Sequence, residues 1–165
     1  MNKPLLHALI IAALAAATST SAFAMDTPKP DPKDPEKKEA VADPLAETRA
    51  AIAREDWSAA QAAARRAVER NPKSADAHNL YAYSMRKGPH PQMDLVFRHY
   101  NEALRLDPRH RAAREYLGEA YLMTGNVAKA KELLAELDRL CKAGCAEQAG
   151  LKSAISTFER QHAAK

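Results

Sequence analysis

Two cysteines carry the clearest potential chemistry of this 165-residue chain. Cys141 and Cys145 are its only cysteines and lie in the sequence Cys-Lys-Ala-Gly-Cys. In an exported protein an even number of cysteines usually forms disulfides, and Gly144 relaxes the backbone between these two. A thiol-redox pair or a copper site would use the same side chains. We therefore predict a structural disulfide, with a metal-binding or thiol-redox function as the alternative.

Four residues form a second candidate site, because Met and His together suit copper in an oxidising compartment. They are His90, Met93, Asp94 and His99. Their spacing matches no specific ligand set, so we expect Met93 to pack at the start of a helix and His90, between two prolines, to be solvated. No metal and no cofactor is predicted. Outside the first 24 residues, the remaining histidines are isolated in the sequence: His78, His110 and His162.

Catalytic signatures are missing from the sequence. It contains no GxGxxG, P-loop, HExxH, GxSxG or CxxC motif. Acidic residues are plentiful, but Glu115 and Glu119 lie beside Arg111 and Arg114 at helical spacing, which is typical of solvated helix charges. The chain is therefore not expected to be an enzyme.

The first 24 residues have the features of a secretory signal peptide. Lys3 is followed by an apolar run from Leu5 to Ala17 and then by Ala22-Phe23-Ala24, a typical cleavage site. The apolar run is shorter than the ~20 residues that span a bilayer. We expect export to the periplasm, cleavage before Met25, and no membrane anchor afterwards.

Residues 25–44 are predicted to form a disordered linker, because they are rich in Pro, Lys and Asp and have no recurring apolar residue. The whole chain has a formal net charge of +4, too small and too dispersed to indicate a nucleic-acid partner. It is rich in Ala, Leu, Arg and Glu and has only 5 glycines, a composition that favours an all-α protein.

Internal repetition begins after the linker. The pattern Ala67 to Pro72 recurs 36 residues later as Ala103 to Pro108. The second helices of the next two units recur after only 34 residues, which places two extra residues within the middle unit. The segment from Gly88 to Gln92 is the most helix-hostile stretch there, so we place the insertion in it.

This repeat resembles the tetratricopeptide repeat, a helix-turn-helix unit of 34 residues. The resemblance divides the chain into a degenerate first repeat at 45–73, a second repeat with a two-residue insertion at 74–109, and a third at 110–143. A capping helix and tail follow at 144–165, where one apolar face contains Leu151, Ile155 and Phe158. The residues that carry the resemblance are Ala60, Ala64, Ala67 and Pro72; Tyr81, Ala82, Met85, Val96, Tyr100, Ala103 and Pro108; and Leu117, Gly118, Tyr121, Gly125, Ala130 and Leu134.

The resemblance implies a right-handed α-solenoid of about three repeats, with a concave groove that binds a protein or peptide partner. Self-association through the exposed ends of the stack is a further possibility. An adaptor or assembly factor of the periplasm is the function expected. Eight residues of the first helices of the second and third repeats are implied to line the groove: Asn79, Tyr83, Arg86, Lys87, Glu115, Glu119, Leu122 and Met123.

Overall fold

The structure, a computed structural model, describes residues 43–163. Within this range it contains α-helices and no strand. The expected signal peptide lies outside the described residues, as does the expected linker except for Asp43 and Pro44. The helices are α1 (Ala46–Ala53), α2 (Trp57–Arg70), α3 (Ala75–Lys87), α4 (Met93–Leu106), α5 (Arg111–Met123), α6 (Val127–Leu140) and α7 (Ala146–His162).

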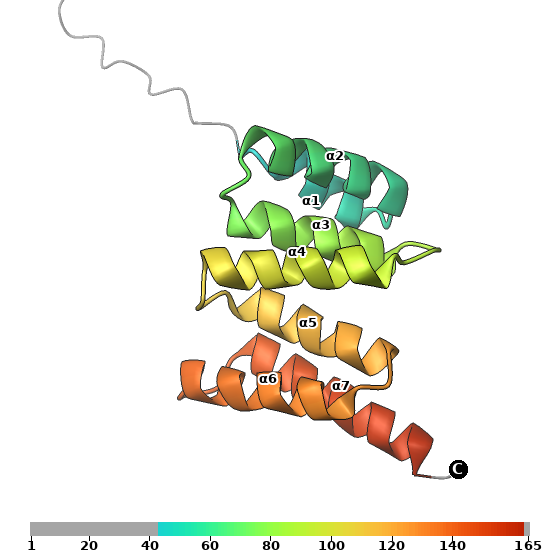
Figure 1. Cartoon of the computed structure of the whole chain (residues 1–165), viewed down its shortest axis with the longest axis vertical. Helices are drawn as coiled ribbons and strands as arrows, with labels where there is room; N and C mark the ends of the chain where they lie inside the picture. Colours follow the sequence, from blue (N-terminus) through green and yellow to red (C-terminus); the bar gives the residue numbers. More distant parts are fainter. Residues whose placement is uncertain (1–42, 164–165) are drawn as a thin grey trace, which may run out of the picture. The chain divides into compact units, whose positions relative to one another are not determined.

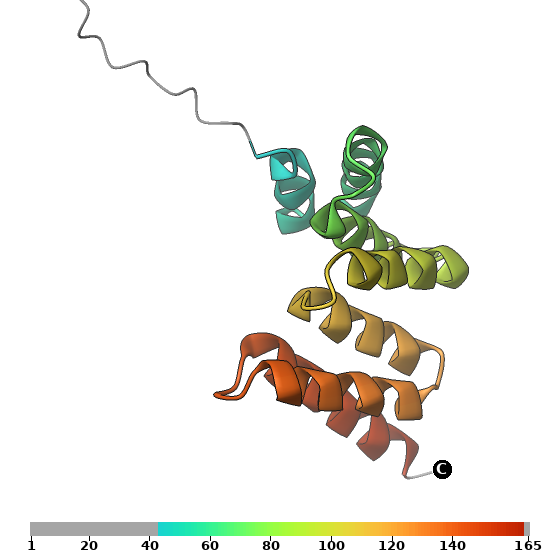
Figure 2. The same ribbon diagram turned by 60° about the vertical axis from the view of Figure 1, so that its left-hand side comes forward.

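The helices stack in chain order to form a helical repeat solenoid (Figure 1). Each helix packs against its neighbour in sequence, and α5 additionally contacts both α3 and α7. Figure 2 shows the same stack of helices turned by 60°. The pairs are α1–α2, α3–α4 and α5–α6, and α7 covers both helices of the last pair. The prediction of an all-α repeat fold is therefore confirmed.

Connections within the pairs differ in length. Three residues separate α1 from α2 and α5 from α6, whereas five residues, 88–92, separate α3 from α4. The longer connection contains Pro89 and Pro91, which lack the amide hydrogen that a helix requires. A helix therefore cannot continue through this segment, and α4 begins only at Met93.

Side-chain caps fix where several helices begin. Ser74 accepts a hydrogen bond from the amide of Ala77 at 3.2 Å and so caps α3. Asn126 caps α6 in the same way. Asp43 accepts a hydrogen bond from the amide of Leu45, and α1 begins at Ala46 without a side-chain cap.

Small residues bring the paired helices close together. Ala60, Ala82 and Ala130 are completely buried where helices pack. At Gly118 a Cβ atom would lie 2.5 Å from a methyl carbon of Leu151, so α5 and α7 approach closely at this glycine. Tyr100 is also fully buried, at the centre of a core that extends from α3 to α7. This core fixes the positions of α3, α5 and α7 relative to one another.

Candidate functional site

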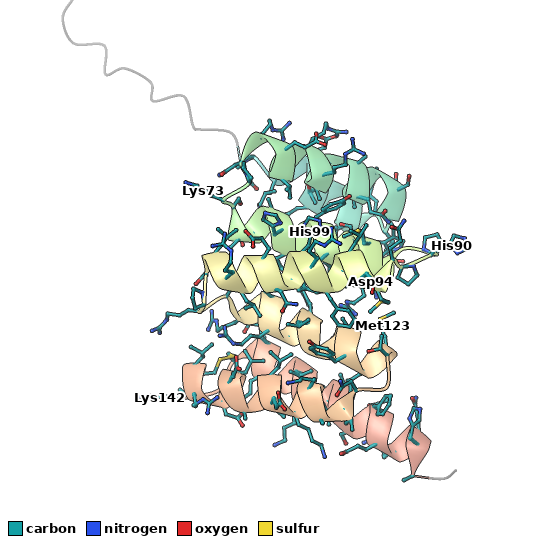
Figure 3. The ribbon with its side chains drawn as sticks, viewed as in Figure 1. Lys73, His90, Asp94, His99, Met123 and Lys142 are labelled. Carbon is teal, nitrogen blue, oxygen red and sulfur yellow. A yellow bond between two sulfur atoms is a disulfide. The ribbon has the colours of Figure 1, made fainter. Side chains whose placement is uncertain are left out.

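The residues that the sequence assigned to a groove fall on α3 and α5, but they differ widely in exposure. Asn79 is only 4% exposed and Arg86 only 7%. Among the described residues Met123 is the one large hydrophobic side chain that is mostly exposed, at 52% (Figure 3). The rest of the set includes an exposed Lys87, a buried Leu122 and three partly buried side chains: Tyr83, Glu115 and Glu119.

Arg86 links three helices from a buried position. Its Nη2 atom forms an ion pair with Glu119 of α5 at 2.6 Å, and its Nε donates to the hydroxyl of Tyr100 of α4 at 3.3 Å. The guanidinium carbon lies 5.5 Å from the ring centre of Tyr83 and 5.7 Å from that of Tyr116. Arg86 was expected to line the groove, but its guanidinium is occupied by the ion pair with Glu119 and the hydrogen bond to Tyr100 inside the protein.

Aromatic rings continue from this arginine along the same face. The ring centres of Tyr83 and Tyr116 are 4.7 Å apart, and those of Trp57 and Tyr83 are 6.0 Å apart. Lys87 places its Nζ 5.8 Å from the ring centre of Trp57. Tyr116 was missed by the sequence analysis because the repeat pattern is defined at the adjacent Leu117. We call Trp57, Tyr83 and Tyr116 the aromatic strip.

The environment of Glu115 differs from the prediction that it is a solvated helix charge. Among residues 43–163 its carboxyl has no hydrogen-bond or ion-pair partner within the protein, and it lies against Gly150 of α7. Burial, together with the nearby carboxylates of Glu119 and Glu147, raises the pKa of Glu115 to about 7. This side chain therefore titrates close to neutral pH.

The arginines expected beside Glu115 pair elsewhere. Arg111 lies 3.8 Å from Glu147 at the start of α7. Arg114 turns to the other side of α5 and lies 2.7 Å from Glu136 of α6. Helical spacing alone could not separate these arrangements, because the partners come from helices distant in sequence.

An open pocket of about 380 Å³ lies between α5 and α7. Its apolar lining comes from Leu122, Met123, Ala154 and Phe158. The Arg86–Glu119 ion pair contributes the polar rim together with Thr157 and Gln161. Leu122 and Met123 were expected in the groove, whereas the contribution of α7 was not.

Cys141 and Cys145 are joined by a disulfide bond, as predicted, with their Cα atoms 5.6 Å apart. The bond closes the turn between α6 and α7.

The second candidate site does not come together in the structure. It was expected from His90, Met93, Asp94 and His99, but His90 lies on the connection before α4, and His99 lies well along that helix (Figure 3). Within residues 43–163 no group of three His, Cys, Asp or Glu side chains could hold a metal ion.

Two of the isolated histidines prove to be in contact with other elements. His78 Nδ1 lies 2.8 Å from His99 Nδ1, and His78 Nε2 lies 3.0 Å from the carbonyl oxygen of Pro72. Since a carbonyl only accepts, Nε2 of His78 carries the hydrogen, so in a neutral pair His99 Nδ1 donates to His78 Nδ1. His110 caps α5 and contacts Asp76 at 3.1 Å.

Comparison with known proteins identifies the repeat. Residues 45–88 and residues 94–155 each match a family model described as a tetratricopeptide repeat. No curated protein matches the chain. Within residues 43–163 no helix is both long enough and apolar enough to cross a bilayer. The two matches leave out 89–93, most of the connection between α3 and α4. On these matches and its helix pairs, the chain belongs to the tetratricopeptide repeat family, whose repeats generally mediate protein–protein interactions.

Proposed function

We propose that this protein is an exported adaptor or assembly factor that binds a peptide or partner helix in the groove formed by α3, α5 and α7. The observation that carries the proposal is the aromatic strip and the adjoining pocket on one face. Partly buried aromatic residues are the side chains that contribute most to protein interfaces. Here they lie on a rigid helical scaffold rather than on a loop.

The charge pattern of this face supports binding rather than catalysis. Arg86 is already paired with Glu119 and hydrogen-bonded to Tyr100, so it is held in place before any partner arrives. Groups held in place in this way lose little conformational freedom on binding. The groove would therefore act as a preformed surface for one segment of a partner.

Export to the periplasm is part of the same proposal. It rests on the signal-like sequence of residues 1–24 and is consistent with the Cys141–Cys145 disulfide, since disulfides persist in oxidising compartments. Cell fractionation of the native host, with mass determination of the mature N-terminus, tests it. Retention of residues 1–24 on protein recovered from the periplasm would contradict cleavage.

Binding in the groove is tested by site-specific photocrosslinking in living cells. A photoreactive amino acid replaces Lys87 or Met123 in the groove, and Arg105 or Lys129 on α4 and α6 as matched exposed controls. We expect a discrete crosslinked partner from the two groove positions only. Adducts from the control positions alone would support the adaptor function but show that the groove is not the binding site. No adduct at any position would refute the function.

A further inference from the structure

Two different features lie along α5, a carboxyl group and an apolar pocket, and together they limit which peptides the groove can bind. The carboxyl of Glu115, which has no ion-pair partner among residues 43–163, lies near the middle of the helix, and the apolar pocket begins at Leu122 near its end. The two positions are seven residues apart in sequence, which corresponds to about 10 Å along a helix axis. Glu119 lies between them and forms part of the pocket rim.

The charge of this region is negative once internal pairs are counted. Three carboxylates lie together, those of Glu115, Glu119 and Glu147, and the last two have arginine partners. Glu115 has no such partner within the described residues and is half-buried against α7. A cation placed beside it would stabilise the ionised carboxyl, whereas an acidic group would add a fourth like charge.

The pocket supplies the apolar part of the recognition. Met123 is exposed at its edge, while Leu122 and Phe158 form the walls. Its volume of about 380 Å³ and its open shape suit one bulky aliphatic or aromatic side chain. Methionine adapts its shape to different apolar partners, so Met123 favours a range of such side chains.

We infer, on the basis of the proposed function, that the groove binds a peptide segment with a Lys or Arg side chain about 10 Å from a bulky apolar side chain. The cation pairs with Glu115, and the apolar side chain enters the pocket beside Met123. Residues three apart in a peptide of polyproline II conformation, or seven apart in a helix, have about this separation and present their side chains on the same face. The charge of the groove and the position of its pocket together define this occupant.

The test is a selection from randomised displayed peptides on the purified full chain. We expect enriched peptides to share a basic residue and a bulky apolar residue at one of these two spacings. Binding of the best peptide should weaken roughly tenfold or more on Glu115→Lys, and on Met123→Lys. Glu132→Lys is the matched control, since Glu132 is an exposed carboxylate on α6 outside the groove.

A charge exchange separates recognition from damage to the fold. The peptide with its basic residue replaced by Glu should bind Glu115→Lys better than it binds the native protein. Circular dichroism and urea unfolding verify that the variant is folded. Enrichment of acidic peptides that still lose binding on Met123→Lys would overturn the inference and leave the proposed function standing.

Two other outcomes would refute the inference in different ways. Peptides that bind Met123→Lys and Glu115→Lys as well as native protein would show that the groove is not the binding site, which refutes both the inference and groove binding and leaves the adaptor function to be judged by the photocrosslinking experiment. Light scattering that finds a dimer of the free protein, dissociated by Met123→Lys, would assign the pocket to a second copy of the chain.

Discussion

Glu115→Gln should stabilise this protein at alkaline pH and leave its stability nearly unchanged in acid. The carboxyl has its pKa raised from an ordinary 4.5 to about 7 by burial and by Glu119 and Glu147. A raised carboxyl pKa means that the folded state binds its proton more tightly than the unfolded state. The ionised form therefore costs stability as pH rises from 4.5 to 7, and the full cost is present above 7.

The size of the effect follows from the shift. Converted in full, the raised pKa corresponds to about 3 kcal/mol. Glu115 is only half-buried, so solvent screening reduces the expected gain to about 1–2 kcal/mol. Gln has the same shape and keeps the contact with Gly150 without the charge.

Urea unfolding followed by circular dichroism measures the difference at about pH 8.5 and about pH 4. Glu132→Gln, at an exposed position, should change stability by no more than about 0.5 kcal/mol. A Glu115→Gln variant with the same stability difference at both pH values, or one less stable than the native protein at high pH, would refute the assignment of a half-buried carboxyl that has no ion-pair partner among residues 43–163.

Three further predictions concern stability. Gly118→Ala should destabilise the fold by about 1–3 kcal/mol despite the better helix propensity of Ala, because the new Cβ would lie 2.5 Å from the fully buried side chain of Leu151 on α7. A thermal midpoint equal to or above that of the native protein would contradict this. The double substitution Cys141→Ser and Cys145→Ser should lower the free energy of unfolding by about 2 kcal/mol, because the crosslink between positions four apart in the sequence is lost. Urea unfolding of the variant, and of native protein with and without reductant, measures this change. An unfolding curve that reductant does not alter would contradict it. The pKa of His99 is lowered by burial and by His78, so stability is retained above about pH 6.5 and falls as the pH drops below it. His99→Leu should weaken that acid dependence between about pH 7.5 and 5, and an unchanged slope would show that this histidine is not its source.

The sequence predicted the architecture well because the repeat is a local pattern. Ala60, Ala82 and Ala130 recur at fixed positions, and each is buried where two helices meet. The starts of α3 and α6 are likewise local features, since Ser74 and Asn126 cap these helices through amides only three positions away. The disulfide was predictable for the same reason, because Cys141 and Cys145 are only four positions apart in the sequence.

What the sequence could not determine is which charges pair between helices. Arg86, Glu115 and Glu119 could all be placed on two adjacent helices from the repeat register. The register does not show that Glu119 takes Arg86 as its partner, or that Glu115 lies against α7 with no ion-pair partner in the part of the chain that the structure describes. Those outcomes depend on side-chain distances across three separate helices, and only the packed tertiary structure fixes such distances. The chain's local periodicity therefore determined its fold, while the electrostatic character of its groove arose from contacts between residues distant in sequence.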